Sequence, residues 1–208
     1  SGLEGEGHGS TAYDMALLTR EALNNADFRA ICSQKNSKIS FGNPPYDRWL
    51  KNSNKLLDYY SGCIGVKTGF TDDAGRCLVS AAERNGVTLI CVTLKAPSDW
   101  SDHAKMFDYG FSIVKNYDLP VSSEPTSINL VGGFKDTVPV KLSAKPTAAL
   151  DAEDFSKVTS KVILQKFIYA PVKIGENVGE VQYSIDGKLF ETIPIVTSED
   201  EEANIDMP

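Results

Sequence analysis

The tripeptide Lys67-Thr68-Gly69 has the residue types of a site that recognises an anionic ligand. The lysine supplies a positive field, the threonine hydroxyl can hydrogen-bond a carboxylate, and the glycine lets a ligand backbone approach closely. A strand at the edge of a sheet can also bind an extended peptide through main-chain hydrogen bonds. The combination suits recognition of a peptide that ends in a carboxylate. The alternative interpretation is an exposed strand end with a solvated lysine.

The two histidines and the four cysteines show no spacing typical of a metal site. His8 lies in a glycine-rich segment, where loop anchoring is a more common role than proton transfer, and His103 has the helical spacing to Phe107 of a packing residue. The cysteines are Cys32, Cys63, Cys77 and Cys91. They form no Cys-x-x-Cys pair, so buried free thiols are favoured over a disulfide or a zinc site. We predict no metal and no cofactor.

Composition excludes some classes of function. The chain has 208 residues, 41% of them apolar, and a formal net charge of -7, which argues against a nucleic-acid-binding protein because such proteins neutralise phosphates with basic residues. No apolar run approaches the roughly 20 residues that span a bilayer, and the N-terminus shows no basic-then-apolar signal pattern.

Periodicity predicts helices and an antiparallel sheet in the first half of the chain. Thr11 can cap a helix over 12–24, and a second helix follows over 27–33. Strands are expected over 64–69, 76–83 and 87–94, and the Asn85-Gly86 pair predicts that the last two form a hairpin. A further helix is expected from Ser98 or Asp99 to 116, with its apolar stripe packed on the sheet.

The second half of the chain has the pattern of an all-β domain. Two prolines in 119–125 indicate a linker, and short strands are expected over 128–131, 138–142, 162–169, 179–185 and 190–196. Such strands are typical of a small sandwich or barrel. The acidic run over 199–204 is expected to be a solvated tail. The predicted division is 1–118, 119–198 and a tail over 199–208.

In this context the tripeptide resembles the third motif of the penicillin-binding serine D-alanyl-D-alanine carboxypeptidases, which is Lys-Thr-Gly on a strand at the edge of a sheet. Other segments resemble family landmarks in the same order along the chain. They are His8-Gly-Ser-Thr-Ala-Tyr-Asp14, Asn54-Lys-Leu-Leu, Gly65-Val-Lys-Thr-Gly-Phe-Thr71, Ala74-Gly-Arg-Cys-Leu, Phe107-Asp-Tyr-Gly-Phe111, Val172-Lys-Ile-Gly-Glu-Asn-Val-Gly and Ile185-Asp-Gly-Lys. The resemblance implies an α+β fold: part of a β-lactamase/transpeptidase-like domain, with antiparallel strands and helices, followed by a small all-β, sandwich-like domain.

The resemblance also implies roles for individual residues. Lys67, Thr68 and Gly69 would bind substrate, and the backbone N–H of Phe70 would be one donor of the oxyanion hole. The intact enzyme would act on the peptide stem of peptidoglycan and would bind β-lactam antibiotics. It would work in the cell envelope, outside the cytoplasmic membrane, with any signal or membrane anchor lying in segments beyond this chain. We expect the β-rich domain to hold the catalytic domain away from the membrane or to contact partners.

The family's Ser-x-x-Lys and Ser-x-Asn motifs, which precede Lys-Thr-Gly, do not occur before Lys67. Ser112-Ile-Val-Lys115 and Ser127-Ile-Asn129 follow it and are interpreted as chance matches. We therefore expect a truncated or proteolysed piece, or one half of an enzyme whose other half is a separate chain. The isolated chain is predicted to lack carboxypeptidase activity. Apolar surface left uncovered would favour a homodimer.

A second departure from the family lies near Ser98, because the segment Ser98-Asp-Trp-Ser-Asp-His lacks the arginine that many relatives carry near the start of this helix. Carboxylate binding would then rest more on Lys67 and Thr68, with Trp100 as a core or rim aromatic. Two other functions stay open: a non-catalytic module that binds cell wall or protein, and a β-lactamase. The added β-rich domain favours the carboxypeptidase over the β-lactamase.

Overall fold

The computed structural model describes residue 5 and residues 7–204, and it divides the chain into two compact units, Ser1–Lys115 and Asn116–Pro208. In the first unit the elements are α1 (Ala12–Leu23), α2 (Ala26–Cys32), β1 (Asn36–Phe41), β2 (Tyr46–Lys51), α3 (Leu56–Tyr59), β3 (Cys63–Thr71), β4 (Gly75–Arg84), β5 (Val87–Thr93) and α4 (Asp99–Ile113). After these come β6 (Lys115–Asp118), β7 (Ser127–Val131), β8 (Thr137–Leu142), β9 (Thr147–Leu150), α5 (Ala152–Ser156), β10 (Val158–Leu164), β11 (Phe167–Tyr169), β12 (Asn177–Ile185) and β13 (Lys188–Thr197).

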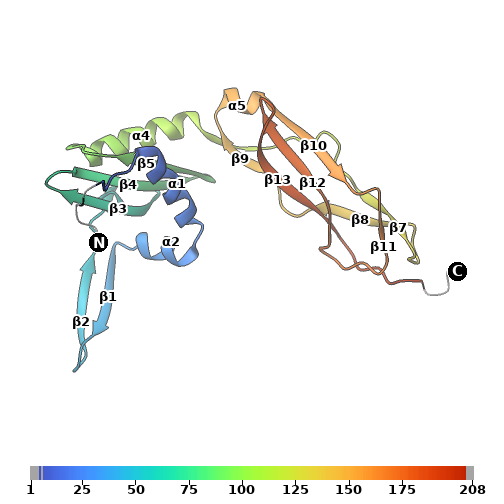
Figure 1. Ribbon diagram of the computed structural model, residues 1–208, viewed down its shortest axis with the longest axis horizontal. Coiled ribbons are helices and arrows are strands. Elements are labelled where there is room, and N and C mark those ends of the chain that lie inside the picture. Colours follow the sequence, from blue (N-terminus) through green and yellow to red (C-terminus); the bar gives the residue numbers. More distant parts are fainter. Residues whose placement is uncertain (1–4, 6, 205–208) are drawn as a thin grey trace. The chain divides into compact units, whose positions relative to one another are not determined.

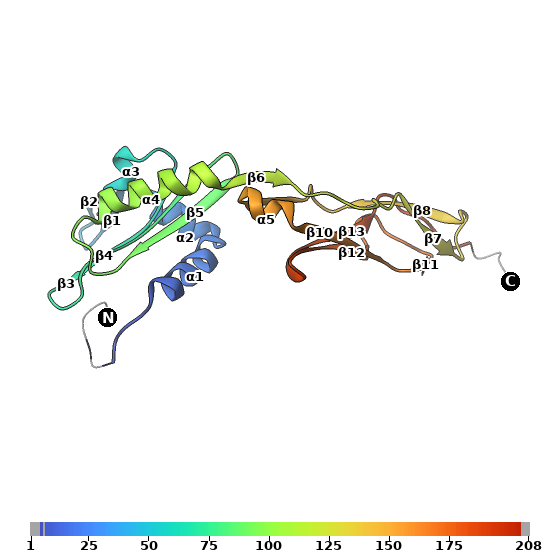
Figure 2. The same cartoon turned by 90° about the horizontal axis from the view of Figure 1, so that it is seen from above.

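The first unit is built on an antiparallel sheet with the order β3-β4-β5. Helix α4 packs on β4 and β5, α1 contacts β4 and β5, and α2 contacts β3. Figure 2 shows α4 on one face of the sheet and α1 on the other. The predicted hairpin at Asn85-Gly86 is confirmed, since Arg84 pairs with Val87 and both turn residues have positive φ.

The strand period of two gives this sheet two separate apolar cores. On β4, Leu78 and Ala82 pack in one cluster with Phe107 of α4. The intervening residues Val79 and Ala81 pack in another cluster with Leu23 of α1. Because successive side chains of a strand point to opposite faces, β4 is covered on both sides and holds β3 at the edge.

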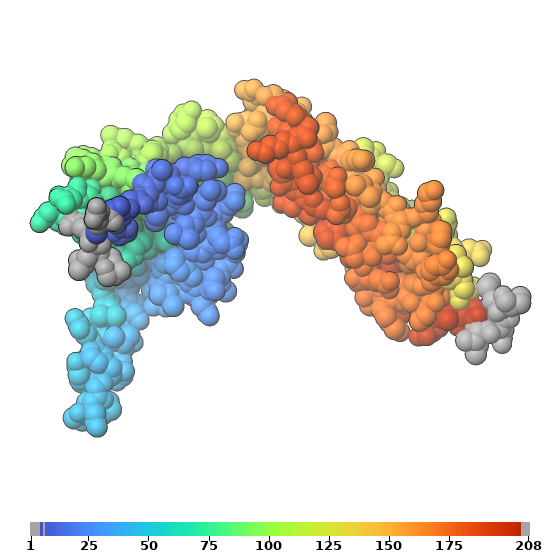
Figure 3. Space-filling view, viewed as in Figure 1, coloured from blue at the N-terminus to red at the C-terminus, as the bar shows by residue number. Residues whose placement is uncertain are grey.

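A hairpin formed by β1 and β2 extends from the first unit and was not predicted from the sequence. Figure 3 shows it as a projection from the rest of the unit, and every residue of β2 is exposed. The segment Gly42-Asn-Pro-Pro forms the turn between the two strands. The flanking residues lack the alternation of buried and exposed side chains that marks a packed strand, so the pattern carried no strand signal.

Helix α4 is shorter than predicted. It ends at Ile113, not at 116, and the chain continues as β6, which pairs with β9. The amide of Leu119 donates to the carbonyl of Pro146 at 2.9 Å, and Leu119 is buried. The start of the expected linker is therefore anchored in the second unit.

The second unit consists mainly of a sheet with the order β10-β12-β13-β8-β7-β11 (Figure 1). Its pairings are antiparallel except for the parallel pairing of β11 with β7. Val138, Val178, Val181 and Ile195 are fully buried in its core. The single strand expected over 162–169 is in fact two strands, because β10 pairs with β12 whereas β11 pairs with β7.

The acidic run over 199–204 is not a solvated tail. Val172 forms an isolated β-bridge with Glu201, and Gly133 forms one with Ala203. Glu201 is only 7% exposed, and its carboxylate pairs with Lys135 at 3.3 Å. The prediction of a solvated tail rested on the acidic composition of this segment. Composition alone does not reveal that neighbouring loops pair with its backbone and that Lys135 supplies a cation to Glu201.

Candidate active site

The tripeptide Lys67-Thr68-Gly69 lies in the middle of β3, whose only pairing among the described strands is with β4. Lys67 is opposite Val79, Thr68 opposite Leu78, and Gly69 opposite Cys77. Lys67 and Gly69 are exposed, while Thr68 is partly buried. The strand therefore offers one free edge beside the tripeptide, which is the arrangement that main-chain recognition of an extended peptide requires.

A cavity of about 590 Å³ lies along this strand. The residues that line it are Gly5, His8, Gly9, Ser10, Met15, Lys67, Thr68, Gly69, Thr71, Asp73, Ala74, Cys77, Leu78, Val79, Leu94 and Lys95. The structure thus brings the glycine-rich segment that contains His8 to the same cavity as the tripeptide. Phe70 does not line this cavity, and the residue is 68% exposed. The oxyanion role that the resemblance implies concerns the backbone N–H of Phe70 and not this side chain.

The ammonium of Lys67 is held close to the strand. Its Nζ donates a hydrogen bond to the carbonyl oxygen of Thr68 at 2.6 Å. The cation thus lies beside the residue whose hydroxyl is expected to contact the ligand. Together the two groups provide a positive charge and a hydroxyl donor, which suit a carboxylate.

The turn between β3 and β4 forms another wall of the cavity. The hydroxyl of Thr71 accepts the N–H of Ala74 at 3.1 Å, which fixes the turn. Gly75 has φ +65°, and a Cβ there would lie 3.2 Å from Cγ of Lys95. Glycine at position 75 therefore permits both the turn and the close approach of Lys95. Lys95 was not predicted from the sequence to lie at the site. Nothing in the local pattern around Lys95 signals this position.

Helix α4 is fixed to the sheet through polar contacts close to the site strand. Arg76 at the start of β4 donates to Asp99 at 2.8 and 3.0 Å, and its guanidinium lies 5.5 Å from the centre of the Trp100 ring. Trp100 packs partly buried at the edge of the core that contains Phe107. Its position agrees with the expectation of a core or rim aromatic.

His103 is a buried structural residue. It is 0% exposed, lies in hydrogen-bond contact with Ser80 through Nδ1, and contacts the Thr93 hydroxyl through Nε2 at 2.9 Å. Burial lowers the pKa of His103 to about 4, and the charges of Asp99 and Asp102 oppose this shift. The imidazole is therefore neutral at pH 7, and it is absent from the lining of the cavity.

The two serine motifs that follow the tripeptide do not contribute to the cavity. The hydroxyl of Ser112 donates to the carbonyl of Tyr109 in its own helix at 2.6 Å, and Ser127 lies on β7 in the other unit. Neither residue lines the cavity. The interpretation of these motifs as chance matches agrees with this placement.

All four cysteines are free thiols. Burial raises the pKa of the thiols of Cys32 and Cys63, and it raises that of Cys91 to about 12. These three are therefore protonated at neutral pH and act as small apolar groups. Cys77 differs in position, since it lies opposite Gly69 in the cavity wall.

Within residues 5 and 7–204, no three His, Cys, Asp or Glu side chains are grouped closely enough to hold a metal ion. In the same part of the chain, no helix combines the length and apolarity needed to cross a membrane.

Family models match both units of the chain. Residues 1–98 match D-alanyl-D-alanine carboxypeptidase of the peptidase S11 type, and residues 119–203 match the penicillin-binding protein 5 C-terminal domain. D-alanyl-D-alanine carboxypeptidase DacF of Bacillus subtilis is 28% identical over 207 residues, which are 96% of this chain and 52% of that protein. DacC of Escherichia coli is 28% identical over 210 residues, 97% of this chain and 50% of that protein. The chain spans about half the length of the curated relatives it matches.

Solved structures show the same fold. Penicillin binding protein 5 from Haemophilus influenzae superposes with a TM-score of 0.61 at 25% identity, covering 96% of this chain and 59% of that one. A peptidoglycan synthesis regulatory factor (PBP3) from Streptococcus pneumoniae superposes with a TM-score of 0.73 at 20% identity, covering 93% of this chain and 57% of that one. These likenesses agree with the expected class: a mixed helix and sheet unit with antiparallel strands, followed by a β domain.

Proposed function

Because the chain belongs to the serine-type D-alanyl-D-alanine carboxypeptidase family and carries a penicillin-binding protein 5-type C-terminal domain, we propose that it is the substrate-aligning part of such an enzyme. The whole enzyme removes the terminal D-alanine from the peptide stem of peptidoglycan in the cell envelope. The observation that carries this proposal is the free edge of β3, with Lys67, Thr68 and Gly69 along one wall of a cavity.

The strand has three tasks in this reaction. Its edge binds the extended stem peptide through main-chain hydrogen bonds, and Lys67 with the Thr68 hydroxyl holds the terminal carboxylate. The exposed Gly69 adds no side chain between the ligand and the strand. The N–H of Phe70 stabilises the oxyanion that forms at the attacked carbonyl. These contacts place the peptide bond between the two D-alanines for attack.

The covalent steps require residues that this chain does not supply. A serine oxygen attacks the carbonyl carbon, the bond to the terminal D-alanine breaks, and its nitrogen takes up a proton as D-alanine leaves. Water then cleaves the acyl-serine ester. Residues 1–66 contain neither Ser-x-x-Lys nor Ser-x-Asn, and Ser112 has its hydroxyl bonded within α4. The chain alone therefore forms no acyl adduct.

Labelling with a fluorescent penicillin tests whether this chain binds substrate while another part of the enzyme supplies the nucleophile. The isolated chain is expected to give no labelled band on a denaturing gel. A protein that joins it to a half containing Ser-x-x-Lys and Ser-x-Asn is expected to be labelled, and to release D-alanine from an N-acyl-D-Ala-D-Ala peptide faster than it hydrolyses penicillin. Label on the isolated chain that disappears in Ser112→Ala would contradict the proposal. Faster penicillin hydrolysis would indicate a β-lactamase.

A further inference from the structure

The β domain holds all of the net negative charge of the protein. Residues 116–208 contain 15 acidic and 8 basic residues, whereas residues 1–115 contain 13 of each. The second unit therefore has a formal charge of -7 and the first a formal charge of zero. A domain of this charge is repelled by anionic lipids and polyanions and attracts cationic partners.

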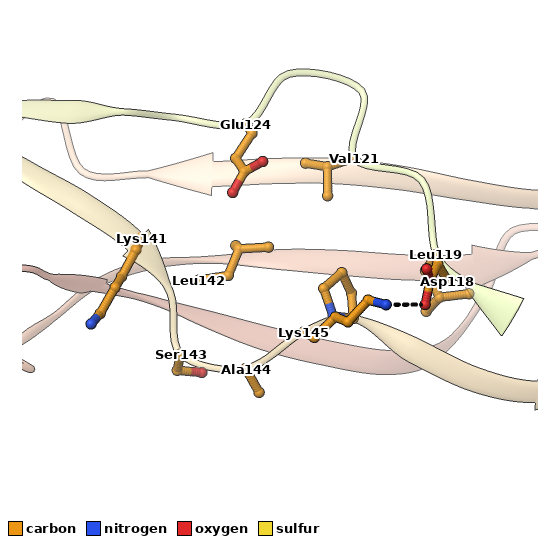
Figure 4. A pocket seen from close by; sticks show the side chains of 10 residues that line it. Asp118, Leu119, Val121, Glu124, Lys141, Leu142, Ser143, Ala144 and Lys145 are labelled. Atoms are coloured by element: carbon orange, nitrogen blue, oxygen red, sulfur yellow. Dashed lines mark ion pairs between the residues drawn. The ribbon is translucent and has the colours of Figure 1, made fainter. Parts of the chain in front are cut away.

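A cleft of about 720 Å³ opens in this unit where β7 and β8 stop pairing. The two strands are in antiparallel register up to Ser127 opposite Pro139, and the N–H of Val140 still donates to the carbonyl of Thr126 at 3.0 Å. In this register the next rung would join Glu124 to Leu142, and no hydrogen bond between these two backbones is formed. Beyond this point the 121–124 segment and the 141–145 segment form opposite walls (Figure 4).

The separation of the strands leaves part of β8 with a free edge. Along a strand, consecutive backbone amides point to alternate sides, and the amide of Ser143 points to β13, where it donates to Pro194 at 2.8 Å. The N–H and C=O of Leu142 therefore face the cleft. No described residue is hydrogen-bonded to them on that side. This is an unpaired strand edge of the kind that captures an extended peptide.

The side chains around this edge favour a basic ligand with apolar neighbours. Figure 4 shows Val121 and Glu124 pointing from one wall toward Leu142 on the other, with Lys141 extending away from Glu124. Lys145 is paired with Asp118 at 2.7 Å, whereas none of the ion pairs formed within the described residues involves Glu124. Lys141 also forms none of these ion pairs, but it points away from Glu124, so Glu124 is the unpaired charge that points toward Leu142.

A buried hydroxyl lies within electrostatic reach of the same carboxylate. Tyr183 is 0% exposed, and its hydroxyl has no hydrogen-bond partner among the described residues. Burial raises the pKa of Tyr183, and the negative charge of Glu124 raises it further. Tyr183 pairs with Ser160, whose hydroxyl accepts the N–H of Ser122 in the cleft wall at 3.0 Å. Tyr183 does not itself line the cleft, so the contacts offered to a ligand come from Val121, Glu124 and Leu142.

We propose that this cleft binds an extended, basic peptide segment of a partner protein. The segment adds a short strand to β8 at Leu142, buries an apolar side chain against Val121 and Leu142, and places a lysine or arginine against Glu124. This site is independent of the β3 cavity and of the proposed carboxypeptidase reaction. It gives the β domain a protein partner instead of a lipid surface.

Fluorescence anisotropy with the full chain tests the proposal, using labelled peptides of alternating lysine and valine, alternating glutamate and valine, and the basic peptide with N-methylated amides. We expect saturable binding of the basic peptide only, together with a shift of the Leu142 amide resonance in NMR spectra of the chain. Glu124→Gln should raise the dissociation constant of the basic peptide about fivefold, which corresponds to the loss of one partly exposed ion pair. The matched control Asp136→Asn, at the opposite end of β8, should leave it unchanged.

Three results would overturn the proposal. They are the absence of saturable binding of the basic peptide, equal binding of the acidic or N-methylated peptide, and equal weakening by Glu124→Gln and Asp136→Asn. Sedimentation of the chain with vesicles of anionic phospholipid measures its binding to a lipid surface, for comparison with its binding to the basic peptide. Stronger binding of the chain to the vesicles than to the peptide would assign the domain to the membrane surface and exclude a peptide as the occupant.

Discussion

Arg76 and Asp99 join the first residues of β4 and α4 through a bidentate ion pair. The two carboxylate oxygens lie 2.8 and 3.0 Å from Nη2 of Arg76, and Oδ1 also accepts the N–H of Trp100 at 2.9 Å. Asp99 is 2% exposed, so this carboxylate is held in a dry environment by three donors. Because Arg76 is opposite Phe70 in the sheet, the pair also fixes the strand that follows the candidate site.

Asp99→Ala is expected to lower the free energy of unfolding of the first unit by about 2 to 3 kcal/mol, since it removes the buried, charged acceptor shared by the half-exposed guanidinium of Arg76 and the N–H of Trp100. Both tryptophans, Trp49 and Trp100, lie in this unit. Urea unfolding followed by tryptophan fluorescence therefore reports on it selectively. The control is Asp102→Ala in the same first turn of α4, which should cost less than about 1 kcal/mol. Equal losses in the two variants would show that the ion pair has no special role.

The neutral His103 predicts a loss of stability in mild acid. Its pKa is lowered to about 4 in the folded protein from an ordinary value near 6.5, so the unfolded chain binds a proton first as the pH falls. The stabilisation by the neutral ring is complete above about pH 6.5 and decreases toward pH 4, by about 3 kcal/mol over that range. Urea unfolding of the first unit at pH 7 and pH 4.5 measures it.

His103→Gln removes this titration and serves as the comparison. Its stability at pH 7 is expected to be lower, because the ring contacts with Ser80 and Thr93 are lost. Its dependence on pH between 7 and 4.5 should be flatter than that of the wild type. If both proteins lose the same free energy over that range, another group is responsible for the acid sensitivity.

Gly179 is a position in the β domain where a side chain cannot be accepted. A Cβ there would lie 2.3 Å from the carbonyl oxygen of Ile163 on the neighbouring strand β10. Gly179→Ala is therefore expected to cost about 3 kcal/mol, because the strand pairing must shift. Gly187→Ala is the matched comparison, since that residue has φ +78° with open space around it, and its cost should be near 1 kcal/mol. Calorimetry that ranks the two variants in the opposite order would contradict this account.

The parts of the fold that could be predicted are those set by local chemistry. Thr11 accepts the N–H of Asp14 and caps α1 as expected, and Asn85-Gly86 turns the β4–β5 hairpin. The parts that were missed depend on distant partners or on the lack of burial. β11 exists only because β7 offers it a parallel neighbour, and β2 buries no side chain that could produce a pattern.

The lining of the cavity beside β3 could be anticipated from the sequence only in part. The Lys67 tripeptide was singled out because its residue types suit recognition of an anion at a strand edge and because the segments around it resemble family landmarks. Lys95 and Asp73 also line the cavity, but they come from turns whose approach depends on Gly75 and on the sheet order. The cleft at Glu124 could not be found either, since it opens where the pairing of β7 with β8 ends, beyond Thr126 and Val140.

The discrimination between a peptide ending in D-Ala-D-Ala carboxylate and its C-terminal amide tests the central claim most directly. It is measured as the ratio of kcat/KM for the two substrates, in the protein that joins this chain to its Ser-x-x-Lys half. We predict that Lys67→Ala reduces the preference for the carboxylate at least about tenfold, the loss of one charge-assisted contact. The control Lys105→Ala, on the exposed surface of α4, should keep it. An unchanged preference in Lys67→Ala would contradict the assignment of the β3 strand to carboxylate recognition.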